Sequence, residues 1–328
     1  MIGVGLMGHG IASNLVKHGH ALTVLDHPGN QPLDALKAAG AAVQPTLQGV
    51  AAAADVIILC VTGSPQVEAI VLGDDGLLKH LRPGTVIVDC STAVPTSTER
   101  VAAAVLAAGG RFVDAPMTRT PKEAAEGRLN LLVGGDAALF AELRPLLACF
   151  AENITHCGGI GAGHRMKLLH NFVSLGGAAL IAEAAACARR GGVAPEVFVD
   201  VLAKGGGGGV ALERVRPYLV SGDASTLKFA MSNAVKDLGY YATMAADAGA
   251  AHAIADGVRA SYERGVQVLG AGSFVPTLVD ATRSRLSERM AYSLATEPAS
   301  RCARKPAARL QPRGEVDARQ RCARIAVG

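Results

Sequence analysis

The chain has no tryptophan, and aromatic residues make up only 4% of its 328 residues. Charged residues are also scarce, at 18%, whereas apolar residues reach 50%, a balance that excludes an intrinsically disordered chain. A length of 328 residues suits one large domain or two domains of ordinary size. We therefore expect a globular protein with a substantial buried core.

The seven cysteines are an odd number and include no C-x-x-C pair, so they show neither a disulfide framework nor a zinc-binding spacing. We therefore expect no metal site and a reducing, cytoplasmic location. The most apolar long stretch, residues 168–188, is interrupted by His170, Asn171, Ser174 and Glu183, which disfavours a membrane span. The first residues lack the pattern of a signal peptide. Neither membrane insertion nor secretion is expected.

Positive charge is concentrated near the C-terminus. The formal net charge is +4, but residues 281–328 hold 11 Lys and Arg against 4 Asp and Glu, which leaves −3 for residues 1–280. A slightly acidic body argues against nucleic acid or an anionic membrane as a partner. Residues 291–328 are rich in Arg, Ala and Pro without periodicity, so we expect a basic, disordered tail. A frame-shifted or read-through end would have the same composition.

Two hydrophobic patterns divide the chain. Up to Cys157, short β-branched runs alternate with Ala- and Leu-rich stretches of helical period, which is typical of βαβ units around a parallel sheet. After Gly163 only helical patterns remain. The sequence thus predicts an α/β domain at residues 1–157 and an all-helical domain at residues 158–290. Strands are expected at 20–26, 42–43, 55–60, 85–89, 111–115 and 129–133, with helices such as 11–17 and 96–108 between them.

The helical part is expected to begin with a long, largely apolar helix from Gly163 to Arg190, buried between the two halves. The run Gly205–Gly209 must interrupt the helices, because glycine is a poor helix former. A flexible loop is the simpler interpretation of this run than a phosphate cradle, since no Lys-Ser or Lys-Thr follows it as in a P-loop.

Glycine is abundant, with 39 residues, and three of them match a dinucleotide-binding pattern. Gly3, Gly5 and Gly8 form G-x-G-x-x-G, a weak signal in so glycine-rich a chain, but a helical pattern follows it as pyrophosphate binding requires. Asp26 ends the next predicted strand, where a carboxylate suits the ribose of NAD and disfavours NADP, although it could instead begin a turn at 27–30.

Only Met1 and Ile2 precede the glycine motif, whereas a central strand usually has about five residues. Either the chain begins downstream of its natural start or the strand is short. In both cases we expect missing hydrogen bonds in the sheet centre and weakened cofactor affinity.

Several ordered blocks together resemble the β-hydroxyacid dehydrogenase family, which includes 3-hydroxyisobutyrate dehydrogenase and tartronate semialdehyde reductase. The resemblance spans residues 1 to about 285. It implies a Rossmann-like domain followed by an all-helical domain, NAD as cofactor with NADP possible, and a homodimer or homotetramer. The blocks are Gly3-x-Gly5-x-Met7-Gly8, Asp89-Cys90-Ser91-Thr92, Asp114-Ala115-Pro116-Met117-Thr118, Gly127-Arg128-Leu129, Gly161-x-Gly163-x-x-x-Lys167-x-x-x-Asn171, Ala182-Glu183-Ala184 and Lys236-Asp237.

The resemblance implies that Lys167 is the catalytic general acid and base. Asn171 follows four residues later on the same helical face, where it would orient the substrate hydroxyl or the lysine. Burial and the positive nicotinamide should lower the pKa of Lys167 from its usual value of about 10.4. A lone lysine on an apolar helix would otherwise be read as a surface residue whose ammonium reaches water.

Substrate contacts are implied for Thr118, Arg119, Asn171 and Asp237. The family usually has Ser-Gly-Gly where this chain has Thr118-Arg119-Thr120, so Arg119 either grips a substrate anion or points to solvent. His170 replaces a common Asn and is interpreted as a packing or pocket neighbour rather than a second base. Cofactor contacts are implied for Gly3, Gly5, Leu6, Met7, Gly8, Asp26, Val61, Thr62, Thr92 and Lys236.

The expected reaction is hydride transfer between NAD and a small 3-hydroxy acid or its semialdehyde. One alternative is a reductase of the sulfolactaldehyde or succinic semialdehyde type, with Arg119 holding a remote anion. Another is a nucleotide-binding protein with impaired turnover, suggested by the short first strand.

Overall fold

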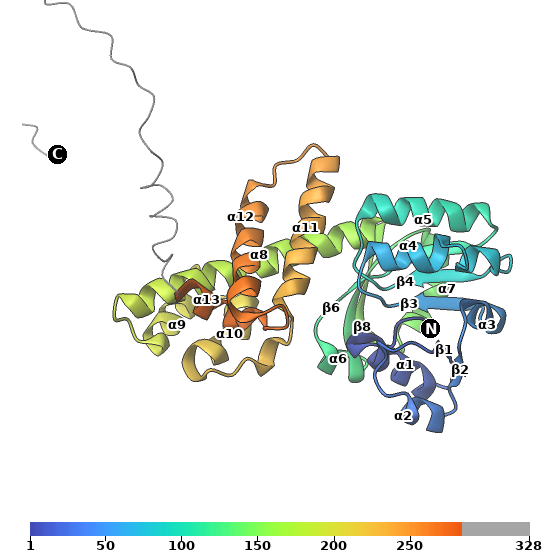
Figure 1. Ribbon diagram of the computed structural model, residues 1–328, viewed down its shortest axis with the longest axis horizontal. Helices are drawn as coiled ribbons and strands as arrows, with labels where there is room; N and C mark the ends of the chain where they lie inside the picture. The colour runs from blue at the N-terminus through green and yellow to red at the C-terminus, as the bar shows by residue number, and fades with distance from the viewer. Residues whose placement is uncertain (284–328) are drawn as a thin grey trace, which may run out of the picture. The chain divides into compact units, whose positions relative to one another are not determined.

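The computed structural model describes residues 1–283, and the expected tail at 291–328 lies outside them. Strands and helices alternate up to β8, and helices follow (Figure 1). The strands are β1 (Thr23–Leu25), β2 (Ala42–Gln44), β3 (Val56–Leu59), β4 (Val86–Asp89), β5 (Arg111–Asp114), β6 (Met117–Thr118), β7 (Leu129–Gly134) and β8 (Ala151–Gly158). The α-helices among them are α1 (Leu6–Lys17), α2 (Asp34–Ala38), α3 (Leu47–Ala53), α4 (Ser64–Leu72), α5 (Pro95–Ala107), α6 (Pro121–Ala125) and α7 (Ala137–Leu147).

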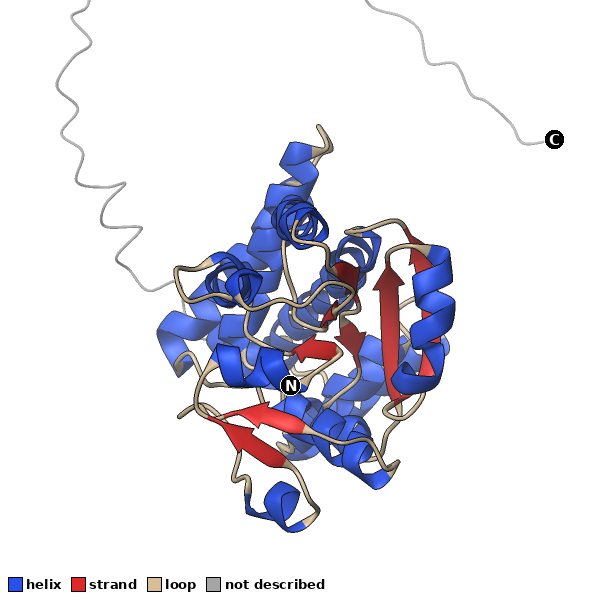
Figure 2. Ribbon diagram, turned by 90° about the vertical axis from the view of Figure 1, so that its right-hand side faces the viewer, coloured by secondary structure: helices blue, strands red, loops and turns tan. Residues whose placement is uncertain are grey.

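The main sheet is mixed rather than parallel. Its strand order is β3-β4-β5-β7-β6, and β8 pairs with β7. The pairs β3–β4, β4–β5 and β7–β8 are parallel, but β7 runs antiparallel to β5 and β6. The expected parallel sheet is found for β3, β4 and β5 but was wrong for the antiparallel β7, and β6 and β8 were not predicted. The fold is nevertheless the expected Rossmann-like α/β arrangement, with strands flanked by helices (Figure 2).

Residues Met1 and Ile2 lie between β1 and β3. The Leu25 amide donates to the Met1 carbonyl at 3.0 Å, while Ile2 exchanges hydrogen bonds of 2.9 Å with Ile58 and Cys60. A single bridge joins Ile2 to Leu59, and β1 and β2 otherwise form a separate two-stranded sheet. The expected short first strand is present, and its two residues form hydrogen bonds with both neighbouring strands.

Both faces of the sheet are buried, because alternate side chains of a strand point to opposite faces. In β4, Val86 and Val88 belong to one apolar cluster, whereas Ile87 belongs to another with Phe112. Helices cover both faces, which explains why these strands read as continuous apolar runs. This rigid centre holds the loops at the carboxyl ends of the strands.

The helical half has a core of its own. Ala-rich α8 packs there with Leu212, Leu238 and Tyr262 from three other helices. The interruption expected at Gly205–Gly209 is confirmed, since one helix ends at Lys204 and the next begins at Val210. The helices are α8 (Ala162–Arg190), α9 (Pro195–Lys204), α10 (Val210–Ser221), α11 (Met231–Asp247), α12 (Ala253–Leu269) and α13 (Leu278–Arg283).

Helix α8 contacts both halves, with β7 and β8 near its start and α10 to α13 beyond (Figure 1). It begins within one residue of the predicted position and ends where predicted. By length and composition it is the one helix among residues 1–283 that could cross a membrane. It buries His164 and Lys167 as well as apolar groups, an arrangement typical of a core helix.

Candidate active site

The glycine motif forms a tight loop between Ile2 and α1. Gly3 has φ +87°, and a Cβ there would lie 2.3 Å from the Cys60 carbonyl oxygen. A Cβ on Gly8 would lie 2.1 Å from the Gly3 carbonyl oxygen, so α1 packs too closely for a side chain. A Cβ on Gly5 would meet nothing within 4 Å. The open side of Gly5 and the first turn of α1 therefore fit a dinucleotide pyrophosphate.

Most other predicted cofactor contacts gather at the carboxyl ends of the strands. Asp26 follows β1 and is exposed, Val61 and Thr62 follow β3, and half-buried Thr92 follows β4. Leu6 and Met7 open α1. Sequence reasoning missed Asn30, whose side chain accepts from the Val4 amide at 3.1 Å and donates to the Leu25 carbonyl at 2.9 Å. Asn30 thereby ties the glycine loop to the end of β1.

The start of α8 is fixed by a buried carboxylate. Asp114 accepts hydrogen bonds from the Gly161 amide at 2.7 Å and the His164 amide at 2.8 Å. Burial raises the pKa of Asp114, and these amides and His164 oppose the rise. Gly163 sits where a Cβ would lie 2.3 Å from the Leu132 carbonyl oxygen. The first turn of α8 is thus locked to β5 and β7, which sets the direction of every later side chain on the helix.

Lys167, one turn further along α8, is a buried ammonium. Only 8% of its surface is exposed. Burial lowers the pKa of Lys167 to about 8, an effect opposed by Asp237 and reinforced by the positive charges of Lys236 and Arg214. A lysine with this pKa exchanges a proton far more readily near neutral pH than an ordinary one.

A chain of polar contacts runs from Lys236 to His170 behind the lysine. Lys236 Nζ donates to the Thr62 carbonyl at 2.6 Å and lies 3.0 Å from Asp237 Oδ1. That Oδ1 makes an ion pair but accepts no hydrogen bond of suitable angle. Asn171 Nδ2 donates to Asp237 Oδ2 at 2.6 Å, and Asn171 Oδ1 lies 3.0 Å from His170 Nδ1. The amide of Asn171 is therefore held on both sides.

The same α11 that carries Lys236 also packs on the loop after β3. A Cβ on Gly63 would lie 2.4 Å from the Tyr240 hydroxyl. The Lys236 ammonium lies 5.3 Å from the centroid of the Tyr240 ring. The helical half thus contacts the sheet half beside Thr62, next to the loop expected to bind the cofactor.

Lys167 opens into a narrow cavity of about 50 Å³. The cavity brings together the predicted residues Lys167, Asn171, Thr118 and Arg119, whereas Asp237 reaches it only through Asn171. Thr118 Oγ1 accepts from Asn130 Nδ2 at 3.1 Å, which leaves the threonine proton for another acceptor. The lining residues are Thr118, Arg119, Lys167, His170, Asn171, Ser174, Leu175, Ala178, Ala211, Arg214, Leu227 and Phe229.

Arg119 lines this cavity, but its guanidinium is engaged elsewhere. It donates to the Arg128 carbonyl and to the Glu152 carboxylate of β8. Its backbone has φ +82°, the one left-handed conformation of a residue other than glycine among those described. Such a conformation costs about 1 kcal/mol or more, so the bonds to β8 help to hold an otherwise strained turn.

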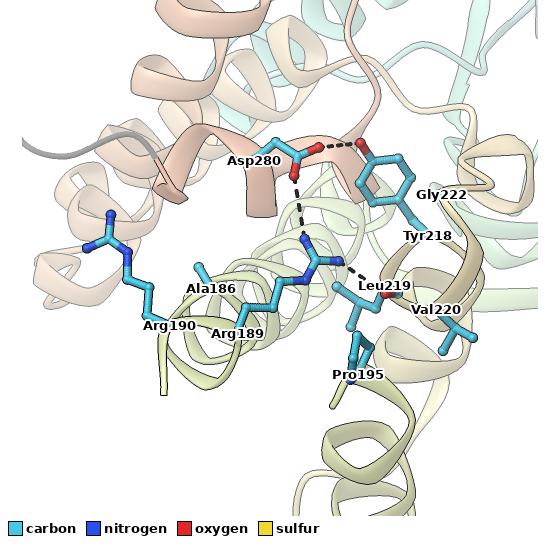
Figure 3. A pocket seen from close by; sticks show the side chains of 9 residues that line it. All are labelled: Ala186, Arg189, Arg190, Pro195, Tyr218, Leu219, Val220, Gly222 and Asp280. Atoms are coloured by element: carbon cyan, nitrogen blue, oxygen red, sulfur yellow. Dashed lines mark hydrogen bonds and ion pairs between the residues drawn. The ribbon is translucent and has the colours of Figure 1, made fainter. Parts of the chain in front are cut away.

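A larger cavity, of about 660 Å³, lies at the other end of α8 (Figure 3). Arg189 there donates to the Leu219 carbonyl at 3.1 Å and lies 3.5 Å from Asp280. Tyr218 donates to the same Asp280 carboxylate. This cavity is more spacious than the one at Lys167, but it contains no lysine with a lowered pKa and none of the predicted site residues. We therefore place the candidate active site at Lys167.

The sequence matches two family models. Residues 1–159 match "NAD binding domain of 6-phosphogluconate dehydrogenase". Residues 161–279 match "NAD-binding of NADP-dependent 3-hydroxyisobutyrate dehydrogenase". The chain belongs to the 3-hydroxyisobutyrate dehydrogenase family. Members of this family are NAD(P)-dependent oxidoreductases acting on CH–OH groups, and so is this protein.

Similar proteins include the NAD-dependent L-serine dehydrogenase of Pseudomonas aeruginosa, 37% identical over 66% of this chain and 72% of that protein. The 3-hydroxyisobutyrate dehydrogenase of the same organism is 35% identical over the same shares. The 2-(hydroxymethyl)glutarate dehydrogenase of Eubacterium barkeri is 34% identical over 73% of this chain and 79% of that protein. A solved 3-hydroxyisobutyrate dehydrogenase of Mycobacterium tuberculosis with L-serine superposes with a TM-score of 0.78, at 29% identity over 86% and 98% of the chains.

Proposed function

We propose that the protein is an NAD-dependent dehydrogenase that interconverts small 3-hydroxy acids and their semialdehydes, with Lys167 as general acid and base. The observation that supports this most is the buried Lys167, whose pKa is lowered to about 8 and which opens into a cavity beside the carboxyl ends of the strands. The lysine is the group on that wall able both to accept and to release a proton in this pH range.

Held at the glycine loop and the first turn of α1, NAD would supply a hydride acceptor for the carbinol carbon during oxidation, and NADH a hydride donor during reduction. During oxidation the neutral Lys167 Nζ accepts the hydroxyl proton, and during reduction the ammonium donates it to the forming alkoxide. The Thr118 hydroxyl donates a hydrogen bond to the substrate carboxylate. Asn171, held between His170 and Asp237, directs its remaining amide proton to the substrate oxygen.

The substrate class follows from what similar proteins share. L-serine, 3-hydroxyisobutyrate and 2-(hydroxymethyl)glutarate, which give three of these relatives their names, each carry a CH₂OH on the carbon next to a carboxylate. They differ in the third substituent of that carbon. We infer that this chain acts on the same HOCH₂–CH(X)–COO⁻ unit. NAD rather than NADP is proposed from exposed Asp26 at the end of β1, where a carboxylate repels a 2′-phosphate.

The roles of the cofactor and substrate residues belong to this proposal, as do a cytoplasmic location, a homodimer or homotetramer, and the division at residue 157. The alternative in which Arg119 holds a remote anion gains little support, because its guanidinium is bonded to Glu152. Impaired turnover is not favoured either, since the glycine loop and Lys167 are both well placed.

A panel of hydroxy acids assayed with NAD and with NADP tests the proposal, with Lys167→Ala as the matched variant. Loss of a general base costs about 10²- to 10⁴-fold in kcat, so we expect Lys167→Ala to lose activity while NADH binding, followed by fluorescence, is retained. In the parent protein kcat/KM for oxidation should rise with pH through about 8, since the neutral lysine is required. For reduction it should fall over the same range, since the ammonium is required.

Undiminished turnover in Lys167→Ala would contradict the proposal. Turnover with NADP but not with NAD would contradict the proposed cofactor.

A further inference from the structure

Besides Lys167, one cation that lines the cavity has no partner in the part of the chain that the structure describes. Arg214 of α10 is half-buried and lines the cavity with Lys167. Its carbonyl accepts from Thr226 Oγ1 at 2.9 Å, but its guanidinium makes no hydrogen bond or ion pair with residues 1–283. Its neighbour Arg216, by contrast, is paired with Glu213 at 2.8 Å. A guanidinium carries five N–H donors and no acceptor, so those of Arg214 are available to an anionic ligand in the cavity.

The charge of Arg214 acts inside the cavity. It lowers the pKa of Lys167, and it also contributes to the lowered pKa of His170, of which burial is the largest cause. The guanidinium is therefore close enough to both groups for its field to reach them. The other cations nearby are occupied, since Arg119 binds Glu152 and Lys236 binds Thr62 and Asp237.

The shape of the cavity separates its charged groups by an apolar wall. Its lining on α8 runs from Lys167 to Ala178, positions eleven residues apart that are separated by about 16 Å along the helix. Leu175, Leu227 and Phe229 provide apolar surface within it. The free space of about 50 Å³ holds one or two waters, so a substrate must displace side chains. Arg214 has no bonds to break when it moves.

Charge balance indicates what such a substrate carries. The carboxylate of Asp237 is matched by Lys236 and Asn171. One substrate carboxylate at Thr118 beside Lys167 still leaves the guanidinium of Arg214 unmatched. A second carboxylate, joined by a short apolar chain, pairs with it through two parallel hydrogen bonds.

We propose that Arg214 determines specificity by binding a second carboxylate, so that the preferred substrate is a 3-hydroxy dicarboxylic acid whose side chain ends in that group. The inference rests on the proposed function, because it assumes that the reacting CH₂OH lies at Lys167. Arg214, and not Arg119, then supplies the bidentate contact to the remote anion.

The test compares 2-(hydroxymethyl)glutarate with 2-(hydroxymethyl)pentanoate, which has the same chain length but a methyl in place of the second carboxylate. Arg214→Ala and Arg214→Lys are assayed in the full-length chain, with Arg216→Ala as a control that removes the same charge from the same helix. The pH is set well above the Lys167 pKa of about 8, so that a change in this pKa caused by the substitution does not alter the measured rates.

Loss of a charged hydrogen bond costs about 1.5–3 kcal/mol. We therefore expect Arg214→Ala to lower kcat/KM for the dicarboxylate by about 10- to 100-fold, mainly through KM, and for the monocarboxylate by less than about 3-fold. Arg214→Lys should recover part of the loss, and Arg216→Ala should match the parent. An equal fall for both substrates overturns the inference, as does a selective loss in Arg119→Ala with none in Arg214→Ala.

Failure of the proposed function gives a different result. If the parent protein oxidises neither compound with NAD or NADP, calorimetric titration of the NADH-loaded chain with glutarate separates the two claims. If the parent binds glutarate and Arg214→Ala binds it about 10-fold or more weakly, the anion site is supported even though the proposed reaction is not. Equal binding by the two proteins, or none by the parent, overturns it.

Discussion

Lys167 illustrates how function opposes stability at a single residue. Its pKa is lowered from 10.5 to about 8 because the ammonium is buried, so the charged form is less stable in the folded chain than in the unfolded one. A shift of this size corresponds to roughly 3 kcal/mol, at about 1.4 kcal/mol per pKa unit. The cost is fully present below pH 8 and disappears as pH rises through 10.5, where both states are neutral.

Replacing this lysine should therefore stabilise the fold. We expect Lys167→Met to raise the free energy of unfolding at neutral pH by about 1–3 kcal/mol, since methionine fills a similar volume without a charge. Between pH 8 and 10.5 the parent protein should gain stability and the advantage of the variant should shrink. Urea denaturation over this pH range measures both effects. A variant less stable than the parent at neutral pH would show that Lys167 makes stabilising contacts instead.

At this scale the sequence predicted the residues that belong to motifs. Lys167 and Asn171 are four residues apart on one helix, so their common direction follows from helical geometry. Arg214 and Asn30 could not be found in this way. Arg214 is one of two arginines on α10, and its place in the cavity depends on how α10 packs against α8. The engagement of Arg119 depends likewise on Glu152 of β8, a strand that was not predicted.

Among the elements, α8 depends on two glycines in opposite ways. A Cβ at Gly163 would lie 2.3 Å from the Leu132 carbonyl oxygen and 2.8 Å from Asp114 Oδ2, where rigid atoms cannot give way. A Cβ at Gly176 would meet only Val258, at an ordinary 3.9 Å.

We expect Gly163→Ala to lower the free energy of unfolding by about 2–3 kcal/mol and to reduce kcat, because Lys167 follows one turn later. Gly176→Ala is the matched control on the same helix. It should raise stability by about 0.5–1 kcal/mol, as alanine favours a helix over glycine. Denaturant titration of both variants gives the comparison. A stability change of the same sign in both would contradict this account of the packing.

Prediction of the elements succeeded where the hydrophobic pattern is strong. Helix α8 and the buried strands β3, β4 and β5 lie within one residue of their expected bounds, since each is apolar over its length. Strand β8 was missed because polar, exposed residues such as Glu152, Asn153 and Thr155 interrupt its apolar pattern, and in the described residues it pairs with β7 alone. Strand β1 is shorter than predicted, as its partner in the sheet centre is only two residues long.

At the scale of the whole molecule, α8 belongs to the packing of both halves. Its first turns contact β7 and β8, and its later turns contact α10 to α13. Neither half can lose its structure without exposing part of this helix. We therefore expect residues 1–283 to unfold in a single cooperative transition rather than one half at a time.

Bound cofactor should stabilise that single transition although its residues lie mostly in the sheet half. NADH at about 100 times its Kd should raise the free energy of unfolding by about 2.7 kcal/mol, and the helical half should share the gain. Circular dichroism and tyrosine fluorescence should give coincident midpoints without NADH, and NADH should shift both midpoints upward by the same amount. Two separate transitions, only one of which moves with NADH, would show that α8 does not couple the halves.

The contact between Tyr240 and Gly63 has a spectroscopic consequence. The chain has no tryptophan, and its five tyrosines all follow residue 217, so its near-ultraviolet emission arises only from the C-terminal part. Among the tyrosines of residues 1–283, Tyr240 is the one whose hydroxyl touches the loop after β3, beside Thr62. Any change in how the two halves contact each other changes the surroundings of this phenol. The native protein thus carries its own optical label at the contact between its two halves.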